Sequence, residues 1–269
     1  MAVDRVVDSG DKLGECPIWD ERMGALWWVD IHGPAIKRWD GALKVFPMPE
    51  APGSIAFREA GGMIVALASG IFTLGTEAPR ALVKPAGHAA GLRFNDGRCD
   101  RAGRFWVGTL REPSFPPEGV LYRVEANGRC QPVKSGIKVP NSIAFSPDGR
   151  TLYFADSPRH KIWSFDYEPD EGKLSNERLF ATPHPGVPDG SCVDAEGCLW
   201  NAEWGGARVV RYTPAGKVDR VLEMPVKNPT CCCFGGARLD TLYITCADGG
   251  GVFATHPGAT GLPEARFRG

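Results

Sequence analysis

One sequence pattern recurs six times along the chain: a short hydrophobic run, a turn, and a second run rich in aromatic and β-branched residues. Its clearest copy is residues 141–156, Asn-Ser-Ile-Ala-Phe-Ser-Pro-Asp-Gly-Arg-Thr-Leu-Tyr-Phe-Ala-Asp. Alignment of the copies on the last residue of the first run selects Trp19, Phe57, Cys99, Phe145, Val193 and Phe234. Repeats of about 40 residues predict either a closed ring or a solenoid.

The content of each copy favours the ring. The runs are short and rich in β-formers, as expected of strands rather than helices. Turns such as 146–149 and 194–197 end in glycine, which adopts the positive φ of a tight hairpin. Most copies continue into a third strand, as at 161–165 and 209–212. Three or four short antiparallel strands per repeat predict an all-β fold, a six-bladed β-propeller.

We expect residues 1–269 to form one such domain. The run at 4–8 precedes the first copy and has no partner there. It is therefore predicted to pair into the last blade and to close the ring, which leaves no free sheet edge between the ends.

The bulk composition excludes some partners. The 31 basic and 32 acidic residues are interspersed and give a net charge of −1, so no nucleic-acid-binding surface is expected. The first residues lack the features of a signal peptide, and no apolar run could span a membrane. We expect a cytoplasmic protein without membrane association, and the near-neutral closed ring is compatible with a monomer. The nine cysteines are expected to be reduced thiols, and Cys231-Cys232-Cys233 are expected to pack in the core.

The repeat alignment also predicts a site. The residues four positions before the aligned set are Glu15, Gly53, Asn95, Asn141, Asp189 and Thr230. Because the first strand of each propeller blade lines the central channel, these side chains should surround one point on the axis. Buried carboxylates are costly without a partner, and a divalent cation on the axis would supply one.

Glu15, Asn141 and Asp189 offer only oxygen ligands, which suit a hard divalent cation with coordination positions left open. The ion could be Ca²⁺, Mn²⁺, Mg²⁺, Zn²⁺ or Fe²⁺. The residues alone leave a second interpretation open, in which they hydrogen-bond strand ends in a wet channel without a catalytic metal.

Several segments resemble the regucalcin and gluconolactonase (SMP-30) family of sugar lactone lactonases. They are 13–19 (Leu-Gly-Glu-Cys-Pro-Ile-Trp), 93–98, 103–109, 139–142, 188–200 and 232–236. The resemblance implies a six-bladed propeller with one axial divalent cation held by Glu15, Asn141 and Asp189. It also implies that Arg93 and Asn95 contact the substrate.

The resemblance implies an enzyme that hydrolyses sugar lactones. We expect a carboxylic-ester hydrolase that opens an aldonolactone such as glucono-, xylono-, arabino- or galactonolactone. The cation would polarise the lactone carbonyl, and Asp189 would be the general base, with metal-bound hydroxide as the alternative. No serine-hydrolase elbow or His-Glu-x-x-His motif is present.

Other functions and residues stay open. A non-enzymatic calcium-binding or interaction propeller is one alternative, and an esterase or phosphotriesterase that uses the same metal site is another. Glu112, in the proline-rich segment 111–118, is a further candidate for substrate contact. His184 lies in a loop just before Asp189, and Trp204 could stack on a substrate ring, although packing is its expected role. The segment after Asp248 is shorter than in many members of that family.

Overall fold

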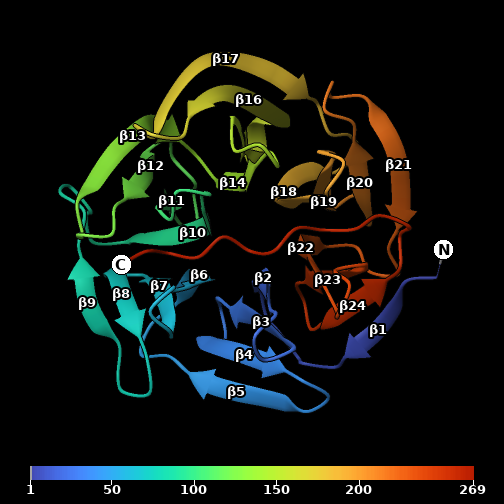
Figure 1. The fold of residues 1–269 in the computed structure, drawn as a ribbon, viewed down its shortest axis with the longest axis horizontal. Helices are drawn as coiled ribbons and strands as arrows, with labels where there is room; N and C mark the ends of the chain where they lie inside the picture. Colours follow the sequence, from blue (N-terminus) through green and yellow to red (C-terminus); the bar gives the residue numbers. More distant parts are fainter. Residues whose placement is uncertain (1) are drawn as a thin grey trace.

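The computed structural model describes residues 2–269, whose strands form six four-stranded antiparallel sheets. Figure 1 shows the sheets arranged as blades of a ring, with the first strand of each blade nearest the centre. The predicted six-bladed β-propeller is confirmed. No helix within residues 2–269 has the length and apolar character needed to cross a membrane.

The strands of the blades have the following bounds. Blade 1 contains β2 (Gly14–Asp20), β3 (Ala25–Asp30), β4 (Ala35–Trp39) and β5 (Leu43–Pro47). Blade 2 contains β6 (Pro52–Phe57), β7 (Met63–Leu67), β8 (Gly70–Leu74) and β9 (Arg80–Val83). Blade 3 contains β10 (Leu92–Cys99), β11 (Phe105–Arg111), β12 (Gly119–Val124) and β13 (Cys130–Ile137).

The second half of the ring follows the same plan. Blade 4 contains β14 (Pro140–Phe145), β15 (Thr151–Asp156), β16 (Lys161–Glu168) and β17 (Lys173–Ala181), with the 3₁₀ turn η1 (Ser157–Arg159) between β15 and β16. Blade 5 contains β18 (Val187–Val193), β19 (Leu199–Trp204), β20 (Arg208–Tyr212) and β21 (Val218–Glu223). Blade 6 contains β22 (Pro229–Gly235), β23 (Thr241–Cys246), β24 (Val252–Thr255) and, from the other end of the chain, β1 (Asp4–Val7).

The N-terminal strand closes the ring as predicted. β1 pairs antiparallel with β24, with Asp4 opposite Ala254 and Arg5 opposite Phe253. Blade 6 is thus built from both ends of the chain, so that the ring opens only if this strand pair separates.

The core is divided among the interfaces between blades. Each of the six hydrophobic clusters is formed mainly by the facing sides of two neighbouring blades. The fully buried indoles of Trp106 and Trp200 also donate to Asp100 and Asp194, which begin the preceding turns. These hydrogen bonds stabilise the turn between the first and second strands of blades 3 and 5. The cysteines are free and mostly buried, and the expected packing role is confirmed for Cys232 and Cys233.

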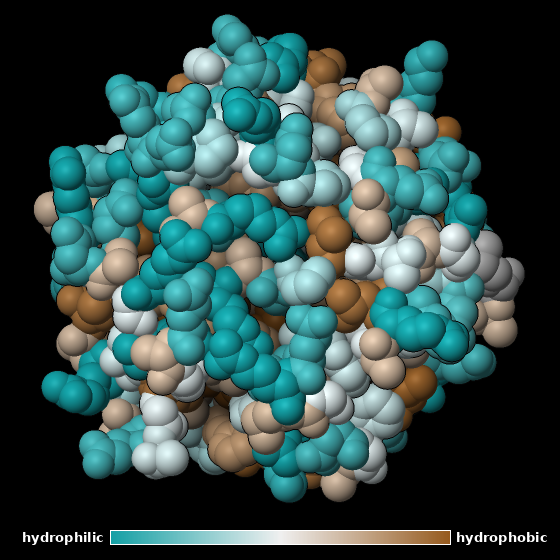
Figure 2. Space-filling model, in the orientation of Figure 1, coloured by the Kyte–Doolittle hydropathy of each residue, from teal (hydrophilic) through white to brown (hydrophobic). Residues whose placement is uncertain are grey.

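The last residues cross the middle of the ring. Figure 1 shows this segment running from β24 to the side of β8 and β9. It contacts the turns after the innermost strands: Thr260 O accepts from Ala195 N, and Arg268 N donates to Gly103 O. Figure 2 shows the same face, on which hydrophilic side chains predominate. The tail therefore covers the channel end opposite the predicted ring residues, which lie at the starts of these strands.

Candidate active site

The predicted ring residues lie near the start of the innermost strand of each blade. Glu15, Asn95, Asn141 and Asp189 belong to β2, β10, β14 and β18, and 4% to 8% of their surface is exposed. The innermost strands of adjacent blades contact one another all the way round the ring. These four side chains therefore surround one end of the central channel.

A register shift of the kind that a β-bulge produces accompanies every ring position. In all six innermost strands the pairing with the second strand shifts register next to the ring residue. Cys16 and Ser142, which follow Glu15 and Asn141, have positive φ angles of 49° and 56°, a strained backbone for residues other than glycine. Bulges re-aim side chains and are common next to active sites. The register shifts thus lie where the candidate site residues are.

Gly53 is the apolar member of the ring because no side chain fits there. A Cβ atom at Gly53 would lie 2.4 Å from the carbonyl oxygen of Phe94 and 2.9 Å from the backbone nitrogen of Asn95. Blade 2 therefore contributes close backbone packing where the other blades contribute a polar side chain.

Glu15 and Asp189 form a buried pair of carboxyl groups within hydrogen-bonding reach of each other. Burial, and then the charge of Asp96, raises the pKa of Glu15 to about 8. Burial, and then the charge of Glu15, raises the pKa of Asp189 well above its ordinary value. Burial is the largest cause for both groups, because water is largely excluded from their site, and the charge of Asp96 also raises the pKa of each. A cation between the two carboxyl groups would lower both pKa values again.

The donors fit such a cation. Asp189 Oδ1 is buried and has no hydrogen-bond partner among the described residues. Asn141 Oδ1 accepts one bond, from Asn95 Nδ2 at 2.9 Å, and a carbonyl oxygen has a second lone pair. Two carboxylates and one amide oxygen are the donor set that a hard divalent ion prefers. Glu15, Asn141 and Asp189 are therefore the residues that could hold it.

The candidate substrate residues also come together. Arg93 Nη1 donates to Asn95 Oδ1 at 2.7 Å, and Arg93 Nη2 lies 2.5 Å from Glu112 Oε1. His32 Nε2 lies 3.3 Å from the other Glu112 oxygen. Burial alone would raise the pKa of Glu112, but the bond and charge of Arg93, and then His32, lower it. The segment after β11 thus reaches the ring through Glu112.

Asp96 and His32 were missed by the sequence reasoning. Asp96 Oδ2 accepts from Ile143 N at 2.7 Å, and burial raises its pKa to about 6. It directly follows Asn95, so the repeat alignment could have found it as the next residue of the same strand. His32 comes from the turn after β3, and no sequence signal connects this turn to Glu112.

The other loop residues singled out in the sequence make the following contacts. His184 is exposed, and its carbonyl oxygen accepts from Arg208. Trp204 packs against the cluster of blades 1 and 2 that includes Leu13, as its expected packing role predicts. Asp248 accepts from Asn228 at 2.6 Å at the short connection between β23 and β24.

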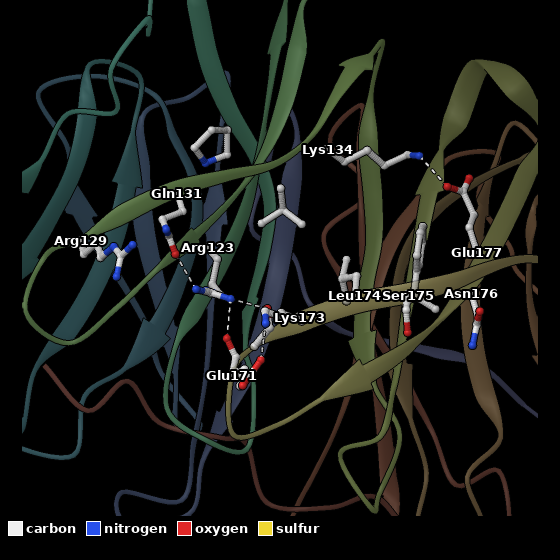
Figure 3. Close-up of a pocket in the computed structure, with 14 residues that line it drawn as sticks. Arg123, Arg129, Gln131, Lys134, Glu171, Lys173, Leu174, Ser175, Asn176 and Glu177 are labelled. Carbon is white, nitrogen blue, oxygen red and sulfur yellow. Dashed lines mark hydrogen bonds and ion pairs between the residues drawn. The ribbon is translucent and has the colours of Figure 1, made fainter.

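A groove lies elsewhere on the molecule, away from the ring residues. It measures about 740 Å³ and is lined by residues of blades 3 and 4, including Arg123, Lys134 and Glu177. Figure 3 shows that some of its charged side chains form ion pairs, as Lys134 does with Glu177 at 2.8 Å. None of the ring residues lines this groove.

The family model described as the SMP-30/Gluconolactonase/LRE-like region matches residues 13–248. The chain belongs to this family. It is 40% identical to 6-deoxy-6-sulfogluconolactonase of Pseudomonas putida over 98% of both chains. It is 37% identical to L-arabinolactonase of Azospirillum brasilense over 98% of this chain and 95% of that relative.

A solved structure of this SMP-30/gluconolactonase family shares the fold closely. The calcium-binding protein regucalcin from Agrobacterium tumefaciens matches with a TM-score of 0.95 and 28% identity, over 99% of this chain and 97% of that chain. The family predicted from the sequence motifs is thus confirmed. The individual roles of Glu15, Arg93, Asn95, Asn141 and Asp189 stay predictions.

Proposed function

We propose that the chain is a metal-dependent hydrolase that opens lactones of sugar acids. The observation that carries the proposal is the buried Glu15–Asp189 pair with its unpartnered oxygen, next to the amide oxygen of Asn141. A propeller that served only as a docking platform would not need two carboxyl groups converging on its channel.

Glu15, Asn141 and Asp189 would hold one divalent cation. When bound, the ion polarises the lactone carbonyl and stabilises the negative charge that develops on its oxygen. Asp96, which lies close enough to affect both carboxyl groups, adds negative charge that attracts the ion.

Asp189 is the proposed general base. It accepts a proton from the attacking water as the new C–O bond forms at the carbonyl carbon. The ring C–O bond of the lactone then breaks, and the proton passes from Asp189 to the departing ring oxygen. The products are the carboxyl and hydroxyl groups of one open-chain sugar acid.

Arg93 and Asn95 would orient the sugar. Glu112 holds the Arg93 guanidinium beside the ring, where it can hydrogen-bond hydroxyl groups of the substrate. Both protons of Asn95 Nδ2 are used by Pro140 O and Asn141 Oδ1. Asn95 can therefore meet a substrate only through Oδ1, as an acceptor.

The names of the relatives support this substrate class, because two relatives aligned over nearly the whole chain are named as lactonases of sugar acids. The regucalcin match, named as a calcium-binding protein, favours calcium binding without catalysis as the second candidate function. The Arg93–Glu112 pair beside the carboxyl groups argues for the enzyme, since ion binding alone does not need it.

The test is proton release from a panel of lactones, with glucono-, xylono-, arabino-, galactono- and 6-deoxy-6-sulfogluconolactone as substrates. We expect at least one to open faster than its spontaneous rate, and a chelator to abolish the difference. If every lactone opens at the spontaneous rate while calcium still binds, the second candidate function is correct.

A further inference from the structure

A chain of hydrogen bonds connects the candidate substrate arginine to the candidate metal ligands. Arg93 Nη1 donates to Asn95 Oδ1 at 2.7 Å, and Asn95 Nδ2 donates to Asn141 Oδ1 at 2.9 Å. Asn141 Nδ2 then donates to Ser157 Oγ at 2.8 Å, and Ser157 Oγ donates to Pro188 O at 2.6 Å. The chain thus ends on the carbonyl that directly precedes Asp189.

The direction of this chain is determined by its two ends. A guanidinium can only donate, and a backbone carbonyl oxygen can only accept. Each group between them must therefore accept from the Arg93 side and donate toward the Pro188 side. This order determines which end of each amide is oxygen, a choice that an isolated amide would leave open.

Ser157 is the link that sets the orientation of Asn141. Its hydroxyl has one proton, which Pro188 O takes, so the hydroxyl can meet Asn141 only as an acceptor. The Nδ2 group of Asn141 must then face Ser157. The Oδ1 atom consequently faces Asn95 and the axis, where a cation would lie.

Ser157 itself is held rigidly. It is nearly buried at the start of η1, and its backbone nitrogen donates to Val139 O at 3.1 Å. The carboxylate of Asp156 accepts from the backbone nitrogens of Lys138 and Val139 at 3.2 and 2.9 Å. Ser157 and its neighbour Asp156 are thereby bonded to Lys138 and Val139, the segment that leads into Asn141.

We propose that Ser157 is a positioning residue, which orients the amide of Asn141 for a divalent cation and ties it to the strand of Asp189. The proposal rests on the metal site of the proposed function and goes further, because it assigns a role to a residue that is not itself a ligand. Outer partners of this kind typically change metal affinity by about 10–100-fold when they are removed.

Thr230 provides a matched control. Its hydroxyl donates to Gly14 O, the carbonyl that precedes Glu15, at 2.5 Å. Its other partner is the hydroxyl of Thr245. The bond to Gly14 O joins neighbouring blades in the same way as the Ser157 bond, but Thr230 contacts no side chain of a candidate ligand.

The test is calorimetric titration of the chelator-treated full chain with Mn²⁺. We expect Ser157→Ala to weaken Mn²⁺ binding about 10–100-fold and Thr230→Val to leave the affinity close to that of the wild type. If Ser157→Ala does not fold, Ser157→Cys replaces it, since a thiol is only a weak donor and acceptor.

The second arm repeats Ser157→Ala in an Asn141→Asp background. A carboxylate accepts at both oxygens, so no amide remains to be oriented, and we expect the penalty of Ser157→Ala to disappear. An equal loss in both backgrounds, an unchanged affinity of Ser157→Ala, or an equal loss in Thr230→Val would overturn the positioning role. If the wild type binds no Mn²⁺, the proposed metal site is wrong and the proposal fails with it.

Discussion

Asp189 has two duties in the proposed reaction, as a ligand of the cation and as the base that takes a proton from water. Replacement by asparagine keeps the size of the side chain and one oxygen donor, but removes the base. We expect Asp189→Asn to reduce kcat for lactone opening by about 10²–10⁴-fold. Asp148→Asn, in an exposed turn, is the control. Wild-type turnover in Asp189→Asn would exclude this residue as the base.

Asp30 supports the site from the end of β3. Its Oδ1 accepts from the backbone nitrogens of Leu13 and Gly33 at 3.0 Å, and Lys37 Nζ lies 3.4 Å from Oδ2. Burial alone would raise the pKa of Asp30, but the backbone bonds and Lys37 outweigh it and lower the pKa below its ordinary value of 3.8. The ionised form is therefore favoured in the folded state.

The pH dependence follows from that direction. The stability contributed by ionised Asp30 is fully present above pH 3.8 and is lost as the pH falls through the lower folded-state pKa. We expect Asp30→Asn to reduce the free energy of unfolding by about 1–3 kcal/mol at pH 7, and this deficit to shrink at acid pH. Urea unfolding at several pH values from 7 to 2.5 measures this difference in the free energy of unfolding, with exposed Asp8→Asn as the control. A deficit that stays constant over this range would contradict the assignment.

The residue scale also shows what the sequence could predict. The alignment of the repeats was enough to predict that Glu15, Asn141 and Asp189 lie together, because six repeats place equivalent positions around one axis. Ser157 could not be found in this way, since it acts from a 3₁₀ turn that, within residues 2–269, only blade 4 contains. His32 reaches Glu112 from another blade, and a contact across 80 residues leaves no local pattern.

At the scale of the element, β1 decides whether the ring is closed. Val7 is buried in the cluster between blades 6 and 1, whereas its neighbour Val6 is exposed. We expect Val7→Ala to lower the free energy of unfolding by about 2 kcal/mol through lost burial and a cavity. Val6→Ala should change it by less than about 0.5 kcal/mol. Equal effects in chemical denaturation would mean that β1 does not close the ring through this contact.

The strands differ in how well their sequences predicted them. The innermost and second strands are hydrophobic runs bounded by turns, and their positions follow from the pattern. The outermost strands carry little signal, because solvent replaces the core on one side. All five residues of β5 are exposed, and most of β17 is polar. The bulges also left no mark on the alignment, since they change side-chain direction and not the spacing of the repeats.

At the scale of the whole molecule, the C-terminal tail joins separate blades below the channel. Phe267 is fully buried between blades 2 and 3, and its backbone nitrogen donates to Phe57 O at 2.8 Å. We expect Phe267→Ala to lower the free energy of unfolding by about 3–5 kcal/mol. Arg268→Ala, which removes an exposed ion pair with Glu59, should change it by less than about 1 kcal/mol. Similar denaturation midpoints for both variants would show that the tail does not stabilise the ring.

The most direct measurement follows ion binding and lactone opening in the same sample. A divalent cation is titrated into the chelator-treated protein while the heat of binding and proton release from a sugar lactone are recorded. We predict that one equivalent of ion restores full turnover and that the two curves coincide. Turnover that persists without the ion, or that continues to rise after one equivalent is bound, would contradict a single axial metal centre as the catalytic site.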